Sequence, residues 1–197
     1  MKRKLKSIDV QNILKEKGMR LFSPVEFQRI FSVSLTAAQE FIKGHSQDLF
    51  VKVRNGLYSL RIDPPTDGMI ANRLYAPSYI SFEYAMARYG LIPESVYTMT
   101  SATTKITREF TVNHISFAYA HIKKQAYRGY RAEKIDGVTV LIAEPEKAFV
   151  DYHYFVDLKL RKLNDRLDTR RLNKKTVMGY AALYNRSSLL KLIREVL

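Results

Sequence analysis

The chain reads Leu49-Phe50-Val51-Lys52-Val53-Arg54-Asn55-Gly56-Leu57-Tyr58-Ser59-Leu60-Arg61 near the end of its first third. Two runs of strand-forming residues flank Asn55-Gly56, a dipeptide typical of a two-residue hairpin turn because both residues tolerate positive φ. We therefore predict a β-hairpin over residues 49–61. Its basic side chains can contact DNA phosphates or enter the minor groove, and they are Lys52, Arg54 and Arg61, with Asn55 at the tip.

Three helices are predicted before this hairpin. Ser7 is a candidate cap for the first helix, and Gly18 follows its end. Ser23-Pro24 marks the start of the second helix, with proline at the first helical position. Ser34 caps a third helix that runs to about Lys43. Three helices followed by a hairpin is the order of a winged helix-turn-helix; an unrelated small α+β domain is the alternative.

The third helix is the predicted DNA-reading helix. Its inward positions are expected to be apolar: Leu35, Ala38, Phe41 and Ile42. Thr36, Gln39 and Lys43 then share the opposite face. Gln39 can pair bidentately with adenine, while Thr36 offers a hydroxyl and a methyl group and Lys43 can reach guanine or phosphate. The alternative is an ordinary solvated helix face.

The charge of the chain favours a polyanionic partner. The 197 residues include 33 Lys and Arg against 19 Asp and Glu, a formal net charge of +14. The excess lies at both ends, with +6 over residues 1–63, +1 over 64–151 and +7 over 152–197. Such basic regions most often contact nucleic acid. The run Lys2-Arg3-Lys4-Lys6 is either a DNA-contacting arm or a solvated tail.

Several classes of protein are disfavoured. The chain has no cysteine, which excludes disulfides, thiolate metal sites and cysteine nucleophiles. The N-terminal residues do not resemble a signal peptide, and the longest aliphatic run, Val138–Ala143, is too short to cross a bilayer. We therefore expect a cytoplasmic protein that does not bind membranes.

Residues Asp63–Gly68, with two prolines and a glycine, are the predicted linker between domains 1–63 and 64–197. The second domain is predicted to be a larger mixed α+β domain with a helical C-terminus, so the fold class is α+β. Helices are expected over 69–75, 82–89, from Pro145, and over 174–184 and 188–197. Strands are expected over 96–100, 109–112, 116–122, 130–134 and 138–143.

Catalytic motifs are weak. The four histidines lack the spacing of a metal site, so neither a metal nor a cofactor is predicted. Glu144, Glu146 and Asp151 lie near Lys147, which invites comparison with restriction-type nucleases, but the pattern needs an acid where Pro145 stands. The acids are better explained as residues of a helix's first turn, where they complement its dipole. We do not expect an enzyme.

The second domain resembles AbiEi-type antitoxins of type IV toxin–antitoxin and abortive-infection systems. The segments that carry the resemblance are Ile70–Ala85, Tyr89–Glu94, Thr100–Thr103 and Ile142–Ala148, together with Arg54-Asn55-Gly56-Leu57-Tyr58 in the hairpin. They cover about residues 20–155, and their joint order makes the resemblance specific.

The resemblance implies a winged-helix domain that represses its own operon, and a C-terminal domain involved in antitoxicity. It also implies a nucleotidyltransferase-like toxin as partner. Double-stranded operator DNA, with an inverted repeat, is the other expected partner. The alternative is an antitoxin that neutralises its toxin by direct contact, with DNA binding secondary.

Further contact residues are expected in the second domain. Tyr79 and Phe82 are predicted to pack in the core while Ser81 caps a helix, although a binding surface that includes Arg73 is the alternative. The basic tail is expected to touch DNA, RNA or an acidic toxin surface, or else to be a solvated face. Its residues are Arg161, Lys162, Arg166, Arg170, Arg171, Lys174 and Lys175.

Overall fold

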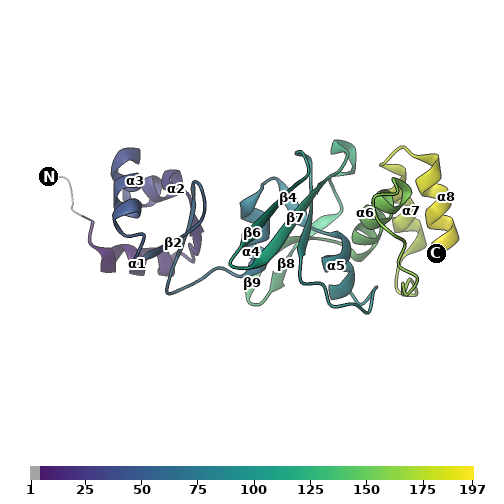
Figure 1. Ribbon diagram of the computed structural model, residues 1–197, viewed down its shortest axis with the longest axis horizontal. Helices are drawn as coiled ribbons and strands as arrows, with labels where there is room; N and C mark the ends of the chain where they lie inside the picture. The colour runs from purple at the N-terminus through teal and green to yellow at the C-terminus, as the bar shows by residue number, and fades with distance from the viewer. Residues whose placement is uncertain (1–4) are drawn as a thin grey trace. The chain divides into compact units, whose positions relative to one another are not determined.

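The computed structural model describes residues 5–197, so the predicted N-terminal arm lies outside them except for Lys6. The chain divides into two compact units, of which unit 1 ends at Ile70 and unit 2 is Ala71–Leu197 (Figure 1). The division falls inside α4 (Asp67–Leu74), beyond the predicted linker. The units are mixed α+β structures, as the predicted fold class requires.

Unit 1 contains three helices and a small antiparallel sheet. The helices are α1 (Ser7–Glu16), α2 (Pro24–Phe31) and α3 (Leu35–Gly44). The strands are β1 (Leu21–Phe22), β2 (Phe50–Arg54) and β3 (Leu57–Leu60), in the order β1-β3-β2. The helices and the hairpin match the predicted order. The two-residue β1, which pairs with β3, was not predicted because it is too short to show an alternating pattern.

Two of the three predicted caps in unit 1 are confirmed. Ser23 and Glu26 form a reciprocal capping box at α2, and the Ser34 hydroxyl accepts from the Ala37 amide at α3 (3.2 Å). The Ser7 cap is wrong, because Ser7 is the first residue of α1 and Lys6 precedes it without a side-chain cap. A cap needs the non-helical backbone of the residue before the first turn.

The core of unit 1 is aromatic. The Phe22 ring packs edge-on against Phe50 with centroids 5.2 Å apart, and Phe27 lies 6.1 Å from Phe50. Phe41 of α3 joins them, 5.7 Å from Phe27. Because β2 and α3 share this core, the packing fixes α3 against the base of the hairpin.

Unit 2 is built on a six-stranded mixed sheet in the order β6-β7-β5-β4-β9-β8. The strands are β4 (Ser78–Ile80), β5 (Met99–Thr103), β6 (Arg108–Val112), β7 (Ile115–His121), β8 (Tyr130–Ile135) and β9 (Val138–Ala143). Only β4 was not predicted. The segment predicted over 96–100 forms a strand three residues later along the chain, as β5.

Helices cover both faces of this sheet. Successive β4 side chains point to opposite faces: the Ser78 hydroxyl donates to the Ala71 carbonyl of α4 (3.4 Å), whereas the Tyr79 hydroxyl donates to Asp151 (2.9 Å). Asp151 belongs to α6 (Pro145–Asp157), which packs against α5 (Phe82–Arg88), α7 (Lys174–Ala182) and α8 (Ser187–Val196). The short helix η1 (Lys124–Ala126) precedes β8.

A side chain completes the sheet where strand pairing is incomplete. The parallel pairing of β4 with β9 is registered only at Ile80 and Ile142. Beside it, the side-chain amide of Asn72 in α4 forms two hydrogen bonds with Leu141. Its Nδ2 donates to the Leu141 carbonyl (3.1 Å), and its Oδ1 accepts from the Leu141 backbone amide (2.6 Å). Asn72 thus imitates a peptide group of a neighbouring strand.

Gly129 is required by a close approach. Its φ is +78°, and an added Cβ would lie 2.6 Å from the Tyr180 ring of α7. The ring is held because its hydroxyl donates to Glu144 Oε2 (2.7 Å). Gly137 has the same φ of +78° but open space around it. A substitution at Gly137 therefore causes backbone strain alone, whereas a substitution at Gly129 causes backbone strain and steric overlap.

We expect Gly129→Ala to lower the free energy of unfolding by about 1–3 kcal/mol more than Gly137→Ala, because only the first substitution forces a packed ring to move. Both variants share the cost of positive φ, roughly 1–2 kcal/mol. Urea unfolding of the two variants measures the difference. Equal losses would show that Tyr180 yields without cost.

Candidate nucleic-acid interface

The predicted reading face is formed on α3. Thr36, Gln39 and Lys43 are all exposed, while Ala38 and Ile42 on the other side of the helix are buried. Leu35 was predicted to face inward, but its exposed fraction is 38%. It is the first residue of the helix, where fewer neighbouring side chains can cover it. The face therefore presents a hydroxyl, an amide and an ammonium group along one line.

The hairpin presents a second set of basic residues. Lys52, Arg54 and Asn55 are exposed, and the pairing of β2 with β3 shifts register between Lys52 and Arg54. Gly56 has a φ of +76° whereas Asn55 keeps negative φ, so only one of the two turn residues uses the freedom expected from the sequence. Alternation along β2 exposes both Lys52 and Arg54 near the tip, and the register shift lies between them.

Arg61 lies at the other end of the hairpin. Its amide donates to the Leu49 carbonyl (3.0 Å), next to the Phe50–Leu60 pair. The strands thus separate Arg61 from Asn55, and the structure does not bring all four predicted hairpin residues together. Lys52, Arg54 and Asn55 form one group, and Arg61 is a separate exposed cation.

These cations are not neutralised within the chain. Among residues 5–197, neither Lys43 nor the hairpin residues Lys52, Arg54 and Arg61 form an ion pair. Unpaired cations on exposed surfaces are available to phosphates without first breaking an internal contact. Glu40 is the exposed carboxylate on α3 and opposes phosphate on its own side of the helix.

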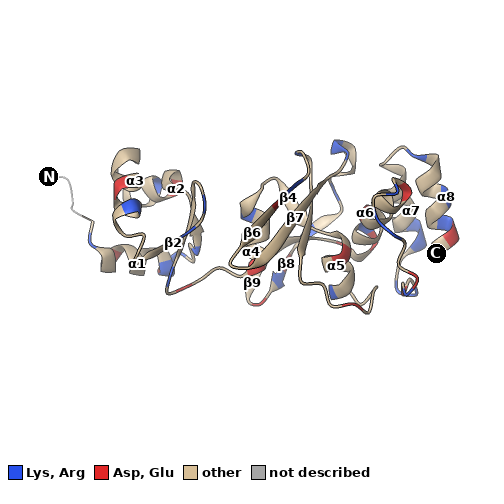
Figure 2. Cartoon of the chain, in the orientation of Figure 1, with Lys and Arg blue, Asp and Glu red and all other residues tan. Residues whose placement is uncertain are grey.

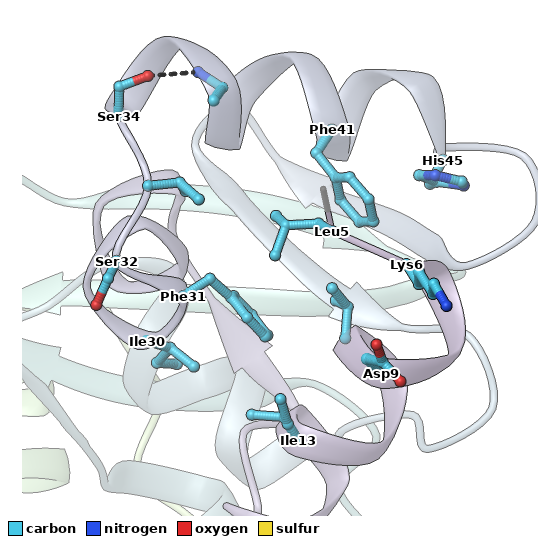
Figure 3. A pocket seen from close by; sticks show the side chains of 13 residues that line it. Leu5, Lys6, Asp9, Ile13, Ile30, Phe31, Ser32, Ser34, Phe41 and His45 are labelled. Atoms are coloured by element: carbon cyan, nitrogen blue, oxygen red, sulfur yellow. Dashed lines mark hydrogen bonds between the residues drawn. The ribbon is translucent and has the colours of Figure 1, made fainter. Parts of the chain in front are cut away.

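A hollow of about 740 Å³ lies on the inner side of α3 (Figure 3). Phe31, Phe41 and Ile13 contribute apolar walls, and Lys6 and Asp9 lie at the end nearest His45. The walls are mostly hydrocarbon, so the hollow suits an uncharged group rather than a phosphate. It lies behind the reading face and takes no part in it.

Unit 2 contains a buried polar cluster around Asp151. Asp151 Oδ1 accepts from Lys147 and from the Tyr184 hydroxyl (2.5 Å), and Oδ2 accepts from Tyr79 (2.9 Å) and Ser81 (2.8 Å). The Lys147 and Asp151 side chains have no solvent exposure. Four donors on two oxygens satisfy the carboxylate, so the cluster acts as a structural node and not as an open active site.

Burial sets the protonation of this cluster. It lowers the pKa of Lys147, although Asp151 opposes the shift, and it raises the pKa values of Tyr79 and Tyr184 well above their usual value. The tyrosines therefore remain protonated donors, as the carboxylate requires. Glu144 and Glu146 do not join the cluster: they accept from the Tyr180 hydroxyl and the Asn173 amide.

The predicted core position of Tyr79 is confirmed, whereas the predicted helix cap at Ser81 is wrong. Tyr79 is buried in the core, as expected. Ser81 precedes α5 but makes no cap with its side chain, because its hydroxyl donates to Asp151. Thr100 of β5 caps the helix instead, since its hydroxyl accepts from the Tyr84 amide (3.1 Å) and donates to the Ser81 carbonyl (2.7 Å). Sequence spacing carries no signal for a cap supplied by another strand.

The basic tail divides into paired and unpaired residues. Arg161 is paired with Glu83 (2.6 Å) and lies over the Phe82 ring, so it stabilises the contact between the tail and α5. Arg166 pairs with Glu94, and Arg170 with Asp168 (2.7 Å). The remaining predicted residues of the tail are exposed, and none of them forms an ion pair within the described chain: Lys162, Arg171, Lys174 and Lys175. Arg73 is exposed at the end of α4.

Further tests of the structure concern metals and membranes. The described residues contain no group of three or more His, Cys, Asp or Glu that could hold a metal ion. Within the same residues, no helix combines the length and apolar character needed to cross a bilayer.

Comparison with known proteins gives no assignment. No protein-family model matches the chain, and no curated protein matches its sequence. The similarity to AbiEi-type antitoxins therefore rests on the short motifs quoted above and stays a prediction.

Removing the charge of Asp151 is expected to destabilise the protein strongly. Asp151→Asn leaves the Lys147 ammonium buried without a counter-ion, a change that costs about 3–5 kcal/mol. Adding Lys147→Met to this variant should recover part of the loss. Urea unfolding measures both, with the exposed Asp165→Asn as a control that should change little. A double variant as unstable as the single one would contradict the ion-pair explanation.

His153 should make stability depend on pH. Burial lowers its pKa to about 4, and its Nδ1 donates to the Phe149 carbonyl (2.7 Å). The unfolded chain takes up this proton near pH 6.5 but the folded chain does not, so stability is lost as pH falls. The expected loss between pH 8 and pH 5 is about 2 kcal/mol.

His153→Asn keeps a donor near the position of Nδ1 and removes the titration, so it should flatten this part of the profile. The matched control is His114→Asn, at an exposed histidine. Urea unfolding at each pH gives the comparison. A profile that is identical in wild type and His153→Asn would assign the pH dependence to other groups.

Proposed function

We propose that the protein is a sequence-specific DNA-binding transcriptional repressor of the winged helix-turn-helix class. The observation that carries the proposal is the exposed, uncompensated face of α3, formed by Thr36, Gln39 and Lys43 beside a basic hairpin. An amide flanked by a hydroxyl and a cation matches the hydrogen-bonding groups of the major groove.

The topology of unit 1 supports this proposal. The element order α1-β1-α2-α3-β2-β3, with β1 paired to β3, fits the order expected for a winged helix. α2 ends at Phe31 and is followed by Ser32, whose φ is +52°, and α3 begins after this short turn. A turn of this length joins the two helices of DNA-binding helix-turn-helix motifs. In such motifs the second helix enters the major groove, so α3 is the proposed reading helix.

We also propose that the repressor is the antitoxin of a type IV toxin–antitoxin system and controls its own operon. This part rests on the motif resemblance, which includes a nucleotidyltransferase-like toxin as partner. Two copies on an inverted repeat would place equivalent helices about 34–36 Å apart, one turn of the duplex. Co-expression with the neighbouring toxin gene tests the antitoxin role: growth should resume when this protein is present, and continued arrest would remove that role.

Gln39→Ala combined with Lys43→Ala should weaken operator preference strongly. The lost base contact costs about 1–3 kcal/mol of discrimination, so preference for the DNA upstream of the gene over a scrambled duplex should fall roughly 5- to 150-fold. Fluorescence anisotropy across a salt series measures it. Gln11→Ala with Lys15→Ala on α1 is the matched control, because it removes the same two side-chain types elsewhere on unit 1.

Wild-type affinity should also fall with salt. With about 6 phosphate contacts, the logarithm of the binding constant should decrease with the logarithm of salt concentration at a slope of roughly −5. Equal affinity of the wild type for both duplexes would refute sequence-specific repression. A slope near zero would refute the phosphate contacts.

A further inference from the structure

Unit 2 carries a set of exposed cations around α7 that have no internal partner. We name them the α7 basic face: Lys124, Arg128, Arg171, Lys174 and Lys175. Across residues 5–197, no ion pair involves any of these five side chains. Asp168 forms its ion pair with the neighbouring Arg170, and Arg171 acts on that carboxyl only through a weaker long-range attraction. Figure 2 shows Lys and Arg on the segment that leads into α7 and on the helix itself.

The five residues belong to two segments that both border α7. Arg171, Lys174 and Lys175 surround Asn173, which caps α7 by accepting from the Thr176 amide (3.0 Å). The segment 124–129 lies along the same helix, because the Gln125 side chain donates to the Leu183 carbonyl (2.6 Å) and Gly129 abuts the Tyr180 ring. Two segments almost fifty positions apart in the sequence therefore carry exposed cations beside α7, one near the C-terminal end of the helix and one at its N-terminus.

The outer side of α7 is unlike the centre of a protein–protein interface. The exposed positions of this helix are Lys174, Lys175, Gly179 and Ala182, and in the described chain no large apolar side chain of the helix is exposed. Protein interfaces concentrate aromatic residues and methionine at their centre and are depleted in lysine. Small side chains between cations instead allow a phosphate backbone to approach closely.

Helix stability does not explain where the lysines lie. Lys174 and Lys175 occupy the first turn of α7, which contains no acidic residue. The positive end of the helix dipole disfavours cations there. The carboxylate at this end of the helix is Glu146, which accepts from the Asn173 amide and, in the described chain, forms no ion pair with either lysine. Both lysines are therefore available to an external anion.

We propose that the α7 basic face is a second DNA-contact surface, which binds the phosphate backbone of a duplex without reading its sequence. The proposal rests on the proposed DNA-binding function and extends it: α3 supplies sequence discrimination, and the α7 basic face adds phosphate contacts. We expect the α7 basic face to make the same electrostatic contribution to binding affinity on operator DNA and on scrambled DNA.

The test is a triple variant of the full chain, Arg171→Ala with Lys174→Ala and Lys175→Ala. Anisotropy titrations with operator and scrambled duplexes between 50 and 300 mM salt give the slope of log affinity against log salt. Loss of three phosphate contacts should make the slope shallower by about 2.7 on both duplexes. Binding at 100 mM salt should weaken at least tenfold. The thermal midpoint should equal or exceed that of the wild type, because the helix dipole no longer opposes two lysines.

The control is Lys134→Ala with Lys191→Ala and Arg194→Ala, three exposed cations outside the α7 basic face, which removes the same net charge. This variant should keep the wild-type slope. Equal changes in both triple variants would mean that only net charge matters, and would overturn the proposal. An unchanged slope in the α7 variant would also overturn it and leave an acidic protein as the partner of this surface.

The two proposals fail separately. Operator preference, compared between the wild type and the Gln39→Ala, Lys43→Ala variant, tests the reading helix. The slope on scrambled DNA, compared between the two triple variants, tests the α7 basic face alone.

Discussion

The carboxylate of Asp151 connects separate elements of unit 2 through four hydrogen bonds. Its four donors come from β4, from the residue before α5, from α6 itself and from the segment that joins α7 to α8. A buried charge is tolerated only when its hydrogen bonds are complete, so each of these elements must be in place for the others to be stable. The sheet, the central helix and the C-terminal helices are therefore held in one arrangement by the buried Lys147–Asp151 pair and the hydroxyl groups that donate to it.

Unit 1 uses a different principle, because it has an aromatic core and its described residues, 5–70, include no comparable buried ion. Phe22, Phe27 and Phe50 hold α3 and the hairpin together. The polar side chains of α3 take no part in this core. The basic side chains also fall into two groups. Arg161 and Arg170 form ion pairs within the chain, whereas Lys43 and Lys174 form none with the described residues. The proposed DNA contacts use the unpaired group.

Local chemistry made most of the fold predictable. The start of α2 at Ser23-Pro24 depends on neighbours in the sequence and matches the prediction. The Asp136-Gly137 turn, in which both residues adopt positive φ, depends on neighbours as well. The node at Asp151 could not be predicted in this way, because Ser81 lies 70 positions from Asp151 and looks like a helix cap. The exposure of Thr36, Gln39 and Lys43 on α3 was predictable from helical periodicity alone. The separation of free from paired arginines needed carboxylates that are distant in sequence, such as Glu83 for Arg161.

The position of Tyr184 in the chain has a consequence for synthesis. This donor follows Asp151 by 33 residues, so a growing chain on the ribosome contains the buried lysine and carboxylate before the group that completes their hydrogen bonds. Domains fold in N-terminal-first order during translation. Unit 1 can therefore acquire its native structure early, while unit 2 waits for its last helices. In that interval the nascent sheet is a substrate for chaperones and proteases.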